Sequence, residues 1–240
     1  MELKSNKMEY ISDFDYINEL ITYTDISKYK SKVKRTIEKI IRRSMDIIGG
    51  IVGSIALIPL TLFIYTANLI SKDKGPIFYT QERIGKDGKI FKMYKYRSMV
   101  VGADEKLVEY LENNEEARKE YKEYKKLKND PRITKIGKFI RKTSLDEFPQ
   151  FINVLRGEMS LVGPRPYLER EKDDIGFFYG YITSCKPGLT GYWQISGRSE
   201  VTFNDRLKMD MEYIKNNDLK EDIKIIGKTI EKIVKKEGAI

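Results

Sequence analysis

One stretch of the 240-residue chain stands apart in its pattern of apolar and polar residues. From Ile47 to Ser71 there is no charged side chain, and Ile, Leu, Val and Ala predominate. As a straight helix this run would measure roughly 37 Å, which is enough to cross a bilayer core of about 30 Å. The pattern therefore predicts a membrane helix rather than a buried helix of a soluble domain.

Pro59 interrupts this apolar run near its middle. It cannot donate a hydrogen bond to the carbonyl of Ile55, and its ring opposes a straight helix. Both flanks of the run are basic, and positive charge favours the cytoplasmic side of a membrane. We therefore expect a re-entrant hairpin, with arms of about twelve residues that each reach roughly 18 Å and return to the same face. Three glycines would allow the arms or neighbouring helices to approach closely, namely Gly49, Gly50 and Gly53.

The remainder of the chain predicts an α/β fold, mostly helical, with a small β-hairpin. Residues 76–81 and 90–96 alternate like strands around a turn at 85–88. Helical spacing is found at 103–128, 147–155, 203–216 and 220–236. We expect three parts: an N-terminal appendage, 1–27; a basic amphipathic segment with the re-entrant membrane helix, 28–74; and a cytosolic domain, 75–240.

Composition narrows the chemistry. The net charge of +9 predicts an anionic partner, which could be nucleic acid, an acidic lipid surface or a phosphorylated substrate. The absence of histidine excludes Ser–His and Cys–His catalysis, so that a metal site would need oxygen ligands and favour magnesium or manganese. The single cysteine, Cys185, cannot form an internal disulfide and is interpreted as a buried, idle thiol in an intracellular protein.

The most suggestive local cluster surrounds two adjacent carboxylates, Asp146 and Glu147. Ser144 and Glu147 fit a capping box at the start of a helix. A carboxylate held there beside Arg141 and Lys142 would stay ionised and oriented, as a nucleophile that forms an acyl phosphate requires. The neighbouring carboxylate could help to hold a divalent cation.

Three further clusters carry cations. Arg165 stands between two prolines, whose rigid turn would fix its guanidinium for bidentate phosphate contact. The segment 186–198 combines three glycines, the only tryptophan and two cations, as a backbone nest for phosphate would. The segment 95–99 adds Lys95 and Arg97 after a strand. Each cluster alone is equally consistent with an ordinary loop.

Taken together, these clusters resemble one family. Arg-Lys-x-Ser-Leu-Asp-Glu-x-Pro-Gln, Ser-Leu-Val-Gly-Pro-Arg-Pro, Lys-Pro-Gly-Leu-Thr-Gly-x-Trp-Gln-x-Ser-Gly-Arg and Tyr-Arg-Ser-Met are all present. They are similar to the motifs of bacterial sugar transferases, the monotopic phosphoglycosyl transferases or polyprenyl-phosphate hexose-1-phosphate transferases. The resemblance runs from about Lys34 to the C-terminus. It also implies a membrane helix broken near a proline, although many small members have Ser before that proline where this chain has Ile58.

The resemblance implies an activity and a place for it. A hexose-1-phosphate would move from a UDP-sugar to polyprenyl (undecaprenyl) phosphate, with release of UMP, as the first membrane step of glycan assembly. Asp146 would be the nucleophile of a covalent phosphosugar–aspartyl intermediate, and Asp146 and Glu147 would hold Mg²⁺. The sugar would be closer to galactose or glucose than to a diacetamido sugar. The protein would be monotopic, on the cytoplasmic face of the bacterial inner membrane.

The substrate contacts implied by the motif match are Arg165, Lys95, Arg97, Arg141, Gln194 and Arg198. The expected partners are the UDP-sugar, polyprenyl phosphate and the lipid bilayer, without nucleic acid, and the amphipathic C-terminal helix could pack in a homodimer. Two rival interpretations are a non-catalytic membrane scaffold that binds anionic lipid and a single-span nucleic-acid binder. Both rivals would tolerate Asp146→Asn, whereas the enzyme would not.

Overall fold

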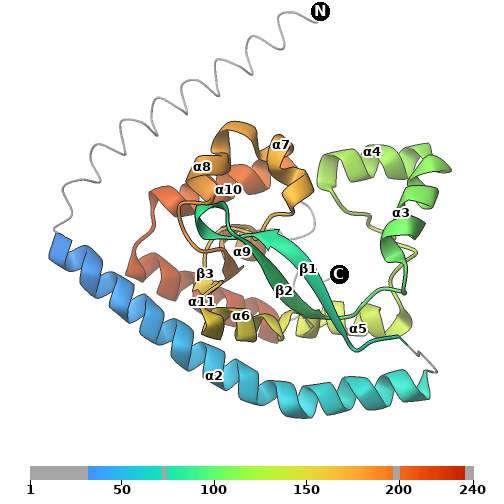
Figure 1. Ribbon diagram of the computed structural model, residues 1–240, viewed down its shortest axis with the longest axis horizontal. Helices are drawn as coiled ribbons and strands as arrows, with labels where there is room; N and C mark the ends of the chain where they lie inside the picture. The colour runs from blue at the N-terminus through green and yellow to red at the C-terminus, as the bar shows by residue number, and fades with distance from the viewer. Residues whose placement is uncertain (1–31, 72–74, 197–200, 236–240) are drawn as a thin grey trace, which may run out of the picture. The chain divides into compact units, whose positions relative to one another are not determined.

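A computed structural model of the chain describes residues 32–71, 75–196 and 201–235 (Figure 1). The chain divides into two compact units, residues 1–41 and 42–240. The described part of the first unit is the beginning of a helix. The boundary expected at residue 27 lies outside the described residues. From Arg42 onward, the predicted membrane segment belongs to the same unit as the domain that follows it.

The apolar run forms helix α2, Lys32–Ile70. It is long and apolar enough to cross a membrane, and most of its apolar stretch is exposed. Pro59 lies inside α2 without ending it, and Figure 1 shows one helix that changes direction instead of two arms folded back on each other. Proline removes a single helical hydrogen bond, so its effect here is a bend and not a break.

The predicted hairpin is present. Strand β1, Phe78–Ile84, pairs antiparallel with β2, Ile90–Tyr96, and Ile84 lies opposite Ile90. A short 3₁₀ turn, Lys86–Gly88, joins them. β1 begins later than predicted because the carbonyl of Pro76 accepts a hydrogen bond from the Arg97 side chain instead of joining the ladder.

Helices form most of the rest of the second unit. After the hairpin come α3, Ala103–Glu112; α4, Glu115–Tyr124; α5, Lys135–Lys142; the 3₁₀ turn η3, Leu145–Glu147; and α6, Gln150–Arg156. Two short turns of helix are α7, Lys172–Ile175, and α8, Tyr179–Ile182. The chain continues with α9, Tyr192–Ser196; α10, Phe203–Lys215; and α11, Leu219–Lys235. A second, parallel pair joins β3, Ser160–Val162, to β4, Gly188–Thr190.

Helix α6 lies at the centre of the core. Asn153 is fully buried, and its side chain accepts a hydrogen bond from the Tyr94 amide and donates one to the Lys92 carbonyl. These bonds satisfy a buried amide and fix α6 against β2. Val154 and Met159 then pack with apolar side chains of β2.

Close packing joins α2 to this core through its glycines. A Cβ atom at Gly53 would lie 2.2 Å from the Phe151 ring, and one at Gly50 would lie 2.7 Å from Leu155. Gly49 faces Leu161 in the same way, at 2.8 Å. The glycines therefore allow α6 and β3 to pack closely against α2. Of the two uses predicted from the sequence, this is the approach of neighbouring elements and not of two hairpin arms.

Polar side chains complete this attachment. Asp46 is buried, and its Oδ1 accepts hydrogen bonds from Ser160 Oγ at 2.9 Å and from the Leu161 amide at 2.8 Å. Arg43 donates to the carbonyls of Val154 at 2.8 Å and Leu155 at 2.7 Å. Since buried polar groups are costly to separate from their partners, α2 from Arg42 onward is a fixed part of the domain.

Candidate functional site

A cavity of about 640 Å³ collects most of the predicted site residues. One wall is apolar and comes from α2 and α11, with Val52, Ala56, Ile226 and Ile230 among its residues. A second group of lining residues carries the polar and charged side chains together with the only tryptophan. It comprises Lys95, Lys125, Lys126, Arg141, Ser144, Asp146, Glu147, Arg165, Trp193, Gln194 and Arg206.

The carboxylate pair lines the same cavity as these apolar and charged side chains. Asp146 and Glu147 are on the 3₁₀ turn η3, just before α6 begins behind Pro149. Ser144 adopts the left-handed conformation, with φ of 56°, and its side chain makes no capping hydrogen bond. The capping box predicted for Ser144 and Glu147 is therefore wrong, because this backbone conformation directs the chain into a tight turn instead.

Glu147 is instead paired with Lys95 of β2. The Lys95 Nζ donates to Glu147 Oε1 at 2.9 Å. The alternation of β2 delivers Lys95 to the cavity side, and this places a cation directly beside the two carboxylates.

Asp146 is almost completely buried, with 8% of its surface exposed. Burial raises the pKa of Asp146 to about 6, against the opposing fields of Lys95 and Arg141, and the neighbouring Glu147 raises it further. The sequence predicted a carboxylate kept ionised by adjacent cations. The cations do lower the pKa of Asp146, but desolvation outweighs them.

Four further predicted contacts differ in where they lie. Arg141 and Gln194 line the cavity, and Arg141 Nε also donates to Ser98 Oγ at 2.8 Å. Arg97 lies outside the cavity, where its guanidinium donates to the carbonyls of Pro76 at 2.6 Å and Met99 at 2.8 Å. These hydrogen bonds hold together the two chain segments at the open end of the hairpin. Arg198 lies outside the described residues.

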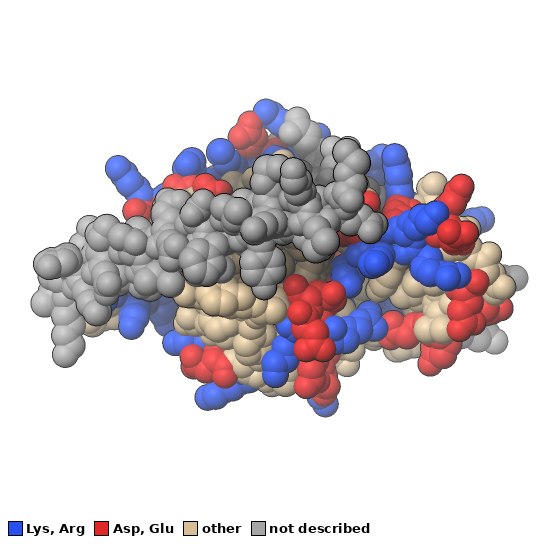
Figure 2. Space-filling model, turned by 90° about the horizontal axis from the view of Figure 1, so that it is seen from above, with Lys and Arg blue, Asp and Glu red and all other residues tan. Residues whose placement is uncertain are grey.

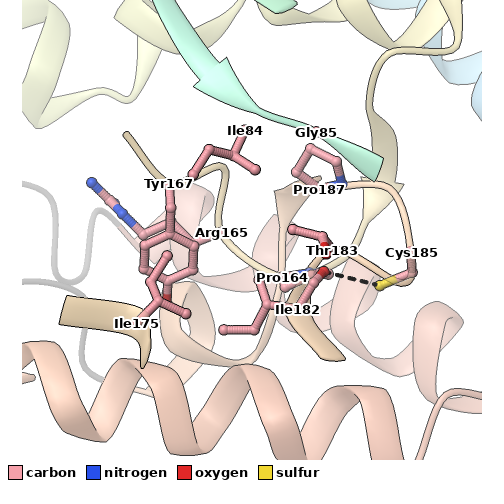
Figure 3. A pocket seen from close by; sticks show the side chains of 10 residues that line it. All are labelled: Ile84, Gly85, Pro164, Arg165, Tyr167, Ile175, Ile182, Thr183, Cys185 and Pro187. Atoms are coloured by element: carbon pink, nitrogen blue, oxygen red, sulfur yellow. Dashed lines mark hydrogen bonds between the residues drawn. The ribbon is translucent and has the colours of Figure 1, made fainter. Parts of the chain in front are cut away.

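Arg165 is presented by the predicted proline turn. Its guanidinium carbon stands 5.0 Å from the centre of the Trp193 ring, within the range of a cation–π contact. The residue also borders a second, very small cavity of about 10 Å³ (Figure 3). In Figure 3 the Arg165 side chain points away from that small cavity. Its charged end therefore serves the large one.

Three cations of the cavity escaped the sequence analysis: Lys125, Lys126 and Arg206. Arg206 stands 6.0 Å from the centre of the Trp193 ring, so that this ring lies near two guanidinium groups. Lys125 has a left-handed backbone with φ of 53° at the end of α4, and its Nζ pairs with Asp174 at 2.8 Å. These residues lie in long charged helices or at their ends, where no short motif distinguishes them from solvated lysines and arginines.

Cys185 borders the small cavity of Figure 3 and lies apart from the large one. Burial raises the pKa of its thiol to about 12, and its Sγ lies 4.0 Å from the Ile182 carbonyl. A thiol with such a pKa stays protonated and unreactive at neutral pH. The buried thiol agrees with the interpretation of Cys185 as idle, and its reactivity stays a prediction.

The distribution of charged side chains over the surface bears on which anionic partner the protein binds. On the face drawn in Figure 2, basic and acidic side chains are interspersed, so the net positive charge is not gathered there in one patch.

Within 32–71, 75–196 and 201–235, no three acidic or cysteine side chains lie close enough together to form a metal site by themselves. A cation bound here would need ligands from its substrate in addition to the carboxylates.

Comparison with known proteins matches residues 37–236 to the sequence model of a family described as "Bacterial sugar transferase". A UDP-galactose-lipid carrier transferase of Erwinia amylovora is 45% identical over 89% of this chain and 44% of its own length. An undecaprenyl-phosphate galactose phosphotransferase of Salmonella typhimurium is 44% identical over 88% of this chain and 44% of its own length. The exopolysaccharide production protein ExoY of Sinorhizobium fredii is 42% identical, over 85% of this chain and 90% of its own length. The chain thus spans less than half the length of the first two relatives.

Proposed function

The chain belongs to the bacterial sugar transferase family, and on this basis we propose that it transfers a hexose-1-phosphate from a UDP-sugar to undecaprenyl phosphate. The relatives' names supply the UDP-sugar and the undecaprenyl phosphate, and the name of ExoY supplies a role in exopolysaccharide production. One observation carries the proposal. A single cavity joins a carboxylate pair to a cationic end and to an apolar wall, as a reaction between a nucleotide sugar and a lipid phosphate needs.

The proposed reaction has two steps. A carboxylate oxygen of Asp146 attacks the β-phosphorus of the UDP-sugar, and the bond from that phosphorus to the bridging oxygen breaks, so UMP leaves with this oxygen. A phosphate oxygen of undecaprenyl phosphate then attacks the same phosphorus and releases Asp146 as a carboxylate. Arg165 and Arg141 would face the negative charge of the donor phosphates.

Lys95 has two roles in this scheme. Its pair with Glu147 holds an ammonium beside Asp146 and lowers the pKa of the nucleophile against the effect of burial. The same ammonium is available to phosphate oxygens once a donor enters the cavity. Only ionised Asp146 can attack the donor. Lowering the pKa of Asp146 is therefore needed before contact between Lys95 and the donor phosphate can help the reaction.

Mg²⁺ is the cofactor that we propose for Asp146 and Glu147. Two carboxylates that line one cavity, completed by substrate phosphate oxygens, are a donor set that suits this ion. When bound, Mg²⁺ would offset the negative charge that develops on the leaving phosphate.

The acceptor would approach from the membrane side. The apolar wall is formed by α2, the helix long and apolar enough to cross a membrane, and by α11. A lipid phosphate lies at headgroup level, so we propose that α2 holds the cavity there. Entry and exit of α2 on the cytoplasmic face is the topology that would keep UDP-sugar and lipid phosphate on one side.

The test is UMP release by the purified full chain with Mg²⁺, undecaprenyl phosphate and a panel of UDP-sugars. We expect UMP with one or a few of these sugars and none with Asp146→Asn. Asp87→Asn in the exposed hairpin turn is the matched control and should retain activity. Equal turnover by Asp146→Asn and the wild type would refute the assigned nucleophile. Absence of UMP with every sugar would favour the non-catalytic scaffold.

A further inference from the structure

Asp210 is a buried carboxylate that has no part in the proposed reaction. We propose that Asp210 is a positioning residue, which fixes the Pro164–Pro166 turn so that Arg165 faces the donor diphosphate. This inference rests on the proposed function. It adds to the site a residue that never touches a substrate.

The geometry of Asp210 supports this role. Its Oδ2 accepts a hydrogen bond from the Arg165 amide at 3.2 Å and another from the Tyr167 hydroxyl at 2.7 Å. These two donors lie on either side of Pro166. One carboxylate of α10 therefore holds the turn at two points. Because proline itself donates no backbone hydrogen bond, the turn depends on such external partners.

Burial of the Asp210 carboxylate is energetically unfavourable, which argues against a purely structural role. It is 0% exposed, and its Oδ1 has no hydrogen-bond partner among the described residues. Burial raises its pKa to about 7, with the charges of Arg165 and Arg206 opposing that rise. A half-satisfied buried carboxylate is disfavoured in a core, and retaining it needs a reason beyond packing.

Arg165 needs this support because its own side chain is weakly held. Its Nε is buried without a hydrogen-bond partner among the described residues, and the contact that steers the guanidinium is the face of Trp193. The direction of the guanidinium is therefore set by the backbone from which it projects. Release of that backbone would move the charged end relative to the donor, and small displacements of this kind reduce rates strongly.

The chain contains a matched control in the next helix. Asp222 of α11 is 3% exposed and accepts a hydrogen bond from the Tyr213 hydroxyl at 2.9 Å. It also accepts one from Arg42 Nε at 2.5 Å. Asp222 thus repeats the burial and the tyrosine contact of Asp210, but it ties α11 to α2 and does not hold Arg165.

The experiment compares Asp210→Ala with Asp222→Ala in the full chain. Three quantities are measured: thermal unfolding, the dissociation constant for UDP, and kcat/KM determined separately for UDP-sugar and undecaprenyl phosphate. Both variants should lose stability. Only Asp210→Ala should weaken UDP binding and lower kcat/KM for the donor, by roughly 10- to 100-fold, with little effect on kcat/KM for the acceptor. Asp210→Asn, which keeps one acceptor oxygen, should recover most of the loss.

Two results would overturn the inference. One is unchanged UDP binding by folded Asp210→Ala. The other is an equal loss in both alanine variants, which would make Asp210 a stability residue only. If Asp210→Ala does not fold, Tyr167→Phe provides the same comparison, since it removes one of the two donors and should weaken UDP binding by a smaller factor. Failure of the proposed function is separate, because then the wild type itself would release no UMP.

Discussion

Replacement of Lys95 by methionine tests how Asp146, the proposed nucleophile, is kept ionised. Methionine keeps an unbranched side chain that is one atom shorter and removes the ammonium that pairs with Glu147 at 2.9 Å. Two changes then act on Asp146 in the same direction. The field of Lys95, which lowers the pKa of Asp146, is lost, and Glu147, which raises that pKa, loses its partner. The pKa of Asp146 should therefore rise above its present value.

The size of this rise follows from the surroundings. A nearby opposite charge shifts a carboxyl pKa by roughly 1–3 units. The Lys95 and Glu147 side chains are 23% and 38% exposed, so solvent screens the pair and we take the lower end, about one unit. With a pKa of about 6, roughly nine-tenths of Asp146 is ionised at pH 7, and after a rise of about one unit roughly half would be.

The assay is the pH profile of kcat/KM for the UDP-sugar, which reports the ionisation of the free enzyme. We expect the acid limb near pH 6 in the wild type, where ionisation of Asp146 is lost as the pH falls. In Lys95→Met it should lie about one unit higher, and at pH 9 only the loss caused by the missing phosphate contact should remain. Lys92→Met, which replaces an exposed lysine of the same strand, should leave the limb in place.

Two outcomes would contradict this reasoning. An acid limb that stays near pH 6 in Lys95→Met would show that Lys95 does not control Asp146. A uniform loss at every pH would show that Lys95 acts only by binding the donor.

Three further predictions concern the metal and the attachment of α2. Raising the Mg²⁺ concentration should shift the acid limb of the wild type to lower pH, because the cation competes with the proton for Asp146; a limb insensitive to Mg²⁺ would remove Asp146 from the metal ligands. Asp46→Ala should lower stability in thermal unfolding by about 2–4 kcal/mol, since it strands a buried backbone amide and a hydroxyl, whereas Ser44→Ala, at an exposed site, should change it little. Gly53→Val should reduce both stability and activity, because a Cβ atom at this position would lie 2.2 Å from the Phe151 ring. Gly227→Ala is the control: its Cβ atom would meet nothing within 4 Å, so stability should be unchanged or slightly higher and activity unchanged. Equal effects of the two substitutions would refute the packing argument.

Much of the fold could be predicted because periodic patterns are local. The β-hairpin follows from alternation around a turn, and α10 and α11 follow from apolar spacing within a residue of their observed ends. The parallel pair of β3 and β4 could not be predicted in this way. Each strand has three residues, too few to establish an alternation, and the pairing joins Ser160 to the distant Gly188.

The candidate site was predictable only where its residues form compact motifs. Asp146, Glu147 and Arg165 belong to such motifs and do line one cavity. Arg97 belongs to one as well, yet its guanidinium is engaged by the carbonyls of Pro76 and Met99. Arg206 lies in the cavity without any motif. A sequence motif therefore indicates which charged residues are candidates for the site. Only the fold determines whether the charged group of such a residue faces the cavity or a backbone carbonyl.

Helix α2, the candidate membrane helix, forms part of the cavity that lines the proposed site. Its Gly53 packs against α6, the helix that directly follows the Asp146 turn, and its Asp46 holds the amide of Leu161, itself a residue of the cavity lining. A change in the depth of α2 would move these contacts together with the carboxylates. Under the proposed function, rigid packing between α2 and the domain would set the height of Asp146 relative to a lipid phosphate, so the acceptor would not have to be drawn out of the bilayer.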